Sequence, residues 1–62
     1  MALKIRVLRE KRKMTQEELA EASGVSRATI SGLENNEETV TTTATLKKLA
    51  AALHVKVSDF FK

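Results

Sequence analysis

Residues 15–35 read TQEELAEASGVSRATISGLEN, and this stretch decides the fold of the 62-residue chain. Thr15 and Glu18 form a capping box, in which each side chain bonds the other's backbone amide where a helix begins. Gly24 can adopt the left-handed conformation that ends a helix without steric cost. Ser26 can then cap a further helix. The stretch therefore predicts two short helices joined by a tight turn, the first stopping just before Gly24 and the second running to about Glu34.

The apolar positions of this stretch are spaced so that both helices bury one face against the rest of the chain. The residues expected to face inward are Leu19, Ala20, Val25, Ile30 and Leu33. Ala20 has to be small, because the second helix of the pair crosses close to it. The outward face of that second helix then carries short side chains and a single arginine, Arg27. Such a surface can approach base edges in a DNA major groove about 12 Å wide.

The flanking segments also follow the helical period. A first helix is predicted at about Ala2–Lys13, and another at about Ala44–Leu53, capped by Thr42 or Thr43. Residues 35–43 (NNEETVTTT) predict an exposed polar loop, and residues after His54 leave room for one last helical turn. The apolar stripe of the later helix is Leu46, Leu49, Ala50 and Leu53. The fold class predicted is all-α: a compact bundle of four helices plus a short fifth C-terminal turn, forming a single domain over residues 1–62.

Composition narrows the classes of function. The chain has no Cys and one His, which excludes a disulfide framework and a zinc site, and no cofactor or metal is expected. Residues 1–13 carry six basic side chains and one acid, whereas the remainder carries five basic and seven acidic ones. Clustered basic charge with a pI of about 9.6 is the electrostatic footprint of a nucleic-acid binder. By itself, a basic helix of this kind is more often a solvated surface.

Membrane insertion and catalysis have little support in the sequence. The longest apolar run is Leu49–Leu53, far below the ~20 residues that span a bilayer. The N-terminus contains no apolar run that resembles a signal-peptide core, so a cytoplasmic protein without membrane contact is expected. No general base is spaced to activate a serine, and the glutamates of residues 17–21 lack a cleft or metal partners. We therefore expect that the chain is not an enzyme.

Three segments together resemble the lambda-repressor/Cro-like (XRE-type) helix-turn-helix family: IRVLREKRKMTQEELA, GVSRATISGLEN and LKKLAAALHVKVSDFF. The resemblance covers essentially the whole chain, and the combination is far more specific than any one segment. It implies sequence-specific binding of double-stranded operator DNA by a transcriptional regulator whose recognition helix lies in the major groove, and repression is the expected mode of regulation.

By position, the resemblance implies a role for individual residues. Gln16 matches the glutamine that bonds a phosphate, and Arg27 is the residue we expect to make a bidentate contact with guanine. Arg9 and Glu34 match a structural salt bridge between the first helix and the end of the third. The remaining positions expected at the DNA are Ser26, Ala28, Thr29, Ser31 and Gly32 on the recognition helix, with Lys13 and Asn36 as backbone contacts.

Two departures from the family pattern affect docking. The loop after Asn35 is acidic (Glu37 and Glu38), whereas relatives have basic residues there. Gly32 offers no side chain at a position where relatives often have a polar side chain that contacts the bases. The acidic loop favours the alternative function, an antitoxin- or antirepressor-like module that binds a protein partner with the same fold.

Homodimerisation is expected as well, because one recognition helix reads few base pairs. The residues proposed for the dimer contact are Phe60, Phe61 and Val57, and adjacent phenylalanines on one helical turn point about 100° apart. One of the two is therefore free to lie on the surface. A two-fold pair would place half-sites roughly 34 Å apart.

Overall fold

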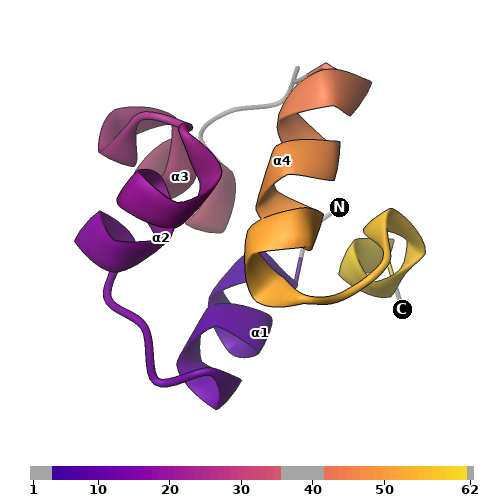
Figure 1. The fold of residues 1–62 in the computed structure, drawn as a ribbon, viewed down its shortest axis with the longest axis horizontal. Coiled ribbons are helices and arrows are strands. Elements are labelled where there is room, and N and C mark those ends of the chain that lie inside the picture. Colours follow the sequence, from indigo (N-terminus) through magenta and orange to yellow (C-terminus); the bar gives the residue numbers. More distant parts are fainter. Residues whose placement is uncertain (1–3, 36–41, 62) are drawn as a thin grey trace.

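The structure is a computed structural model, and it describes residues 4–35 and 42–61. Within these ranges the chain forms four α-helices and one short 3₁₀ helix, with no strand (Figure 1). The elements are α1 (Ile5–Lys11), α2 (Gln16–Ser23), α3 (Arg27–Glu34), α4 (Thr43–Leu53) and η1 (Val57–Phe61). The predicted all-α bundle of four helices with a short fifth turn is confirmed. Asn36, Glu37, Glu38 and the predicted helix start at Ala2 lie outside the described residues.

The helices α2 and α3 begin and end where local sequence predicts. Thr15 Oγ1 accepts a hydrogen bond from the Glu18 amide at 3.1 Å, and Glu18 Oε1 accepts one from the Thr15 amide at 2.8 Å. Gly24 has φ +76°, the left-handed conformation expected after α2. The Ser26 side chain accepts from the Thr29 amide at 3.2 Å and caps α3. Caps and turn together set the short connection between the two helices.

The helix α1 ends earlier than the sequence predicts, at Lys11 instead of Lys13. Lys13 has φ +55°, so the chain leaves the helical conformation before that residue. Arg9 supplies a reason for the early exit, because its Nη1 donates to the Met14 carbonyl oxygen at 2.7 Å and holds the chain in the turn toward α2. Periodicity alone does not report this contact.

The helix α4 begins at Thr43, with Thr42 as its cap: the Thr42 hydroxyl oxygen accepts from the Thr45 amide at 3.2 Å. The left-handed cap at its other end is His54, with φ +58°. A backbone hydrogen bond of 3.0 Å from the Lys4 amide to the Phe60 carbonyl oxygen ties the start of α1 to η1. The C-terminal turn is therefore an integral part of the bundle.

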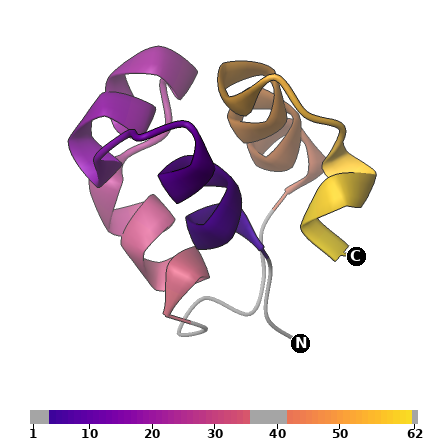
Figure 2. The same cartoon turned by 90° about the horizontal axis from the view of Figure 1, so that it is seen from below.

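One apolar core joins all five elements. The helix α4 packs against α2, α3 packs against α2 and α1, and η1 packs against α4 (Figure 2). The buried apolar residues are Ile5, Leu19, Val25, Ile30, Leu33, Leu46, Leu49, Ala50, Leu53 and Phe60. All four predicted positions of the α4 stripe are among them. Both views place η1 on the side of the molecule away from α2 and α3.

Candidate nucleic-acid interface

The first turn of α3 presents its side chains in a fixed arrangement. Arg27 and Ala28 are exposed, and Thr29 is half-buried. The Ser26 hydroxyl donates to Thr29 Oγ1 at 2.8 Å while accepting from the Thr29 amide, so the cap sets the positions of both hydroxyl groups. The turn therefore exposes one long cationic side chain among short ones.

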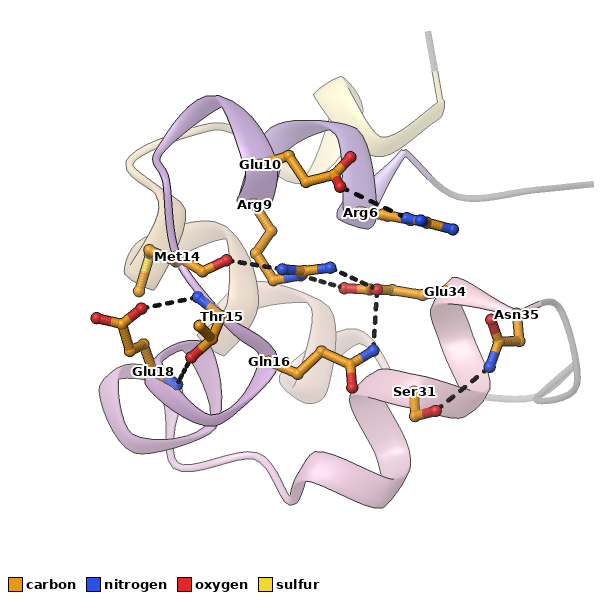
Figure 3. A network of polar contacts seen from close by, with 10 residues as sticks. All are labelled: Arg6, Arg9, Glu10, Met14, Thr15, Gln16, Glu18, Ser31, Glu34 and Asn35. Carbon is orange, nitrogen blue, oxygen red and sulfur yellow. Dashed lines mark hydrogen bonds and ion pairs between the residues drawn. The ribbon is translucent and has the colours of Figure 1, made fainter.

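The next turn of α3 continues the same pattern of small side chains. Ser31 and Gly32 are half-buried, and Asn35 Nδ2 donates to Ser31 Oγ at 3.3 Å (Figure 3). Because these residues are short, the helix backbone can come close to a partner surface along this face. Asn36, which was predicted to contact the DNA backbone, lies outside the described residues.

Arg27 has a partner on α2 that the sequence did not reveal. Its Nη1 lies 3.1 Å from Oε1 of Glu17, with both side chains well exposed, at 61% and 75%. No pattern in the sequence indicates this contact. The pairing of Glu17 with Arg27 depends on the angle at which α2 and α3 cross, which the turn at Gly24 sets.

A buried carboxylate gathers three hydrogen bonds at the other end of α3 (Figure 3). Arg9 Nε donates to Glu34 Oε2 at 2.7 Å, and Arg9 Nη2 donates to Glu34 Oε1 at 3.1 Å. Gln16 Nε2 donates to the same Oε1 at 3.1 Å. The structure thus brings Arg9 and Glu34 together as a bidentate pair and adds Gln16 to it, so the network joins α1, α2 and α3.

This network shifts the pKa values of both charged partners, Arg9 and Glu34. Burial alone would raise the pKa of the Glu34 carboxyl, but the hydrogen bonds from Arg9 and Gln16 and the nearby arginine charges outweigh it, so the pKa lies below its ordinary value. The hydrogen bond to Glu34 raises the pKa of Arg9 above its ordinary value. Both groups therefore remain charged at neutral pH, and the pair stays intact.

Gln16 and Lys13 lie where the chain enters α2. Lys13 is exposed and sits in the turn before Thr15, while Gln16 is the half-buried first residue of α2. A primary amide nitrogen carries two hydrogens, so the bond from Gln16 to Glu34 leaves a second donor on Nε2. The network therefore orients the Gln16 amide without using all of its capacity.

The residues predicted for a dimer contact separate into buried and exposed positions. Phe60 is fully buried in the core, which corrects its assignment as a contact, because its side chain has no surface to offer. Phe61 is 50% exposed, and Val57 is half-buried against the core. Packing η1 against α4 decides which of the two phenylalanines turns inward. Phe61 and Val57 remain as the candidates for a dimer contact.

Within the described ranges, residues 4–35 and 42–61, no group of three or more His, Cys, Asp or Glu residues could hold a metal ion. No helix there is long and apolar enough to cross a membrane.

The caps, the tight turn at Gly24 and the exposed first turn of α3 define a helix-turn-helix unit. In agreement, the sequence model of the helix-turn-helix family matches residues 5–60. The chain belongs to this helix-turn-helix family.

Two curated proteins of Bacillus subtilis (strain 168) are similar to this chain. It is 53% identical over 51 residues to the HTH-type transcriptional repressor RghR. It is 51% identical over 51 residues to the uncharacterized HTH-type transcriptional regulator RghRB. Each match covers 82% of this chain but only 38% and 37% of the respective relative. The chain thus spans less than two fifths of the length of these relatives.

Proposed function

We propose that this chain binds operator DNA as the recognition domain of a transcriptional repressor, with α3 in the major groove. The observation that carries the proposal is the capped first turn of α3, where Arg27 stands exposed among short side chains beside the start of α2. An arginine in this setting can make a bidentate contact with O6 and N7 of guanine. The repressor class is supported by the name of RghR, which is similar over most of this chain.

The other contacts follow from the placement of the remaining residues. Ser26, Ala28, Thr29, Ser31 and Gly32 are short enough to let α3 approach the base edges. Gln16 and Lys13, at the entrance to α2, would contact phosphates, and Asn36 is proposed for the same role. Phosphate contacts fix the position of the protein on the duplex, whereas Arg27 supplies the base discrimination.

The regulator is proposed to act as a homodimer in the cytoplasm, without catalytic turnover. Phe61 and Val57 would supply the apolar contact between the two copies. A bound dimer with half-sites roughly 34 Å apart would occupy its operator and block polymerase sterically.

A protein-binding module is the second candidate. The acidic surface of α2 favours it, since Glu17, Glu18 and Glu21 are all exposed there and would oppose contact with phosphates. Salt separates the two functions, because DNA binding weakens steeply as salt rises and counterions are no longer released favourably. An apolar protein contact responds little to salt.

In vitro selection from a random duplex library, at low and near-physiological salt, tests the proposal. We expect enrichment of a two-fold symmetric motif. The Arg27→Ala variant should lose preference at one guanine in each half-site, at a cost of about 1–3 kcal/mol in discrimination. Failure to enrich any motif, with weak binding even at low salt, would favour the protein-binding module. An unchanged motif in Arg27→Ala would remove Arg27 from the recognition surface.

A further inference from the structure

The ion pair between Glu17 and Arg27 contributes little to folding. Both side chains are well exposed, and the contact is a single one, from Nη1 to Oε1 at 3.1 Å. Exposed pairs of this kind are close to neutral for stability, because the gain in Coulomb energy is offset by solvation and by the ordering of two long side chains. The ion pair therefore affects the conformation of the Arg27 side chain more than it affects the stability of the fold.

The contact leaves Arg27 able to bind a base. A guanidinium has five N–H donors in a planar fork, and a bidentate contact with guanine uses two of them. Glu17 engages Nη1 from the side of α2, which leaves donors on Nη2 and Nε. A carboxylate at one edge of the guanidinium restrains its plane while the other edge stays available. A lysine ammonium in the same place has no plane to orient.

Restraint of the free side chain matters for specificity. A flexible arginine loses conformational freedom when it docks on a base, and this loss weakens the specific complex. If Glu17 orders Arg27 beforehand, that loss is smaller for the one geometry that fits guanine. A phosphate contact accepts many orientations of the guanidinium, so non-specific binding gains little from the restraint.

The negative charge of Glu17 weakens non-specific binding. A carboxylate near the recognition helix repels phosphates of any sequence and lowers affinity for all DNA. Glu17 thus combines two effects. The general repulsion lowers the affinity for specific and non-specific DNA alike, and only the selective restraint of Arg27 increases the ratio of specific to non-specific affinity.

We propose that Glu17 is a specificity-determining positioning residue, which orders the Arg27 guanidinium for guanine through the contact between Oε1 and Nη1. This inference rests on the proposed operator-binding function. Glu17 acts through Arg27 and touches no base.

The test compares Glu17→Ala with Glu21→Ala as the matched control. Glu21 is exposed on the same helix one turn further on, so its substitution removes the same charge and leaves the Arg27 contact in place. Affinities are measured for the selected operator and for the operator with the Arg27-dependent guanine replaced. We expect Glu17→Ala to lower the ratio of these affinities by about two- to tenfold. Glu21→Ala should leave the ratio unchanged.

Two additional variants separate restraint from charge. Glu17→Gln retains an Oε1 acceptor for Arg27 without the negative charge, so it should recover part of the ratio lost in Glu17→Ala. In the Arg27→Ala background, Glu17→Ala should have no effect on the ratio. In the DNA-free protein, the heteronuclear NOE of the Arg27 Nε–H group should fall in Glu17→Ala and stay unchanged in Glu21→Ala.

The outcomes distinguish this inference from the function it rests on. One outcome would overturn the positioning role alone: the wild-type protein selects an operator, but Glu17→Ala leaves the ratio of the two operator affinities unchanged or increases it. An increased ratio would mean that Glu17 competes with DNA for Arg27. A wild-type protein that selects no motif would overturn the proposed function, and the positioning role with it.

Discussion

The two ends of α3 carry ion pairs of the same chemistry in opposite surroundings. At its C-terminal end, Glu34 binds Arg9 through two hydrogen bonds, the shorter of 2.7 Å, and the side chains are only 2% and 12% exposed. At its N-terminal end, Arg27 meets Glu17 through one contact of 3.1 Å, with side chains that are 61% and 75% exposed. Both pairs join α3 to another helix, but only the first is shielded from water.

Because of this difference in burial, the two ends of α3 are expected to contribute differently to stability and to recognition. Removing one partner of a buried pair leaves a charge without solvent or counter-charge, which is strongly destabilising. Water replaces a lost partner at an exposed pair, so little folding energy depends on it. We therefore expect the Glu34 end of α3 to determine how firmly the helix is held, and the Arg27 end to be free to serve a ligand.

The largest effect is expected for Glu34→Ala. The substitution leaves the Arg9 guanidinium without its carboxylate and deprives Gln16 of its acceptor. A loss of about 3 kcal/mol is expected, at the low end for a broken buried pair because Arg9 keeps some access to water. For a domain of this size, the melting temperature should fall by more than about 10 °C in thermal denaturation followed by circular dichroism.

Glu10→Ala is the matched control for that measurement. Glu10 pairs with Arg6 at 3.7 Å, and both side chains are more than half exposed. The control should cost less than about 0.5 kcal/mol, as expected for an exposed pair one helical turn apart. Equal melting temperatures for Glu34→Ala and Glu10→Ala would show that burial does not distinguish the two kinds of pair.

A smaller effect is expected from acid. The pKa of Glu34 is lowered in the folded state from an ordinary value of 4.5, so its contribution to stability is fully present above that value. The contribution is lost as the pH falls below 4.5 through the folded-state pKa. Melting temperatures measured from pH 7 downward should therefore drop more steeply below pH 4.5 in the wild type than in Glu34→Gln. Parallel curves for the two proteins would contradict the depressed pKa.

A small effect on folding is expected at the exposed pair of Arg27 and Glu17. Arg27→Ala and Glu17→Ala should each change the free energy of unfolding by less than about 1 kcal/mol, because the pair is solvated. This limit includes the favourable interaction of the Glu17 charge with the N-terminus of α2, where Glu17 lies in the first turn. Chemical denaturation in urea measures this change. A loss comparable to that of Glu34→Ala would mean that the Arg27 end of α3 is structural, and the division proposed along the helix would fail.

Local signals made α2, α3 and the turn between them predictable. The capping box at Thr15, the glycine at position 24 and the Ser26 cap each act within a few residues, so their effect can be read without knowing the rest of the fold. The apolar stripe of α4 was equally clear, since its period is helical and its four positions are all buried. Such segments can be predicted from the sequence because their local propensity and their burial pattern agree.

The errors lie where distant residues meet. The early end of α1 depends on the bond from Arg9 to Met14, and the inward turn of Phe60 depends on the packing of η1 against α4. Adjacent phenylalanines carry no local signal for which one is buried. For the candidate site, the family resemblance supplied the positions, including the pairing of Arg9 with Glu34. The bonds from Gln16 to Glu34 and from Arg27 to Glu17 were not predicted.

By itself, the sequence determined the helical class of this protein, the caps and turn of its helix-turn-helix unit, and most of its core. These features depend on backbone conformation and on burial periodicity, which residue types specify locally. The tertiary structure alone decided which charged side chains meet and how much water reaches them. The crossing of α1, α2 and α3 buries Glu34 and exposes Glu17, and that difference in solvation separates the carboxylate that holds the fold from the one that we propose orders Arg27.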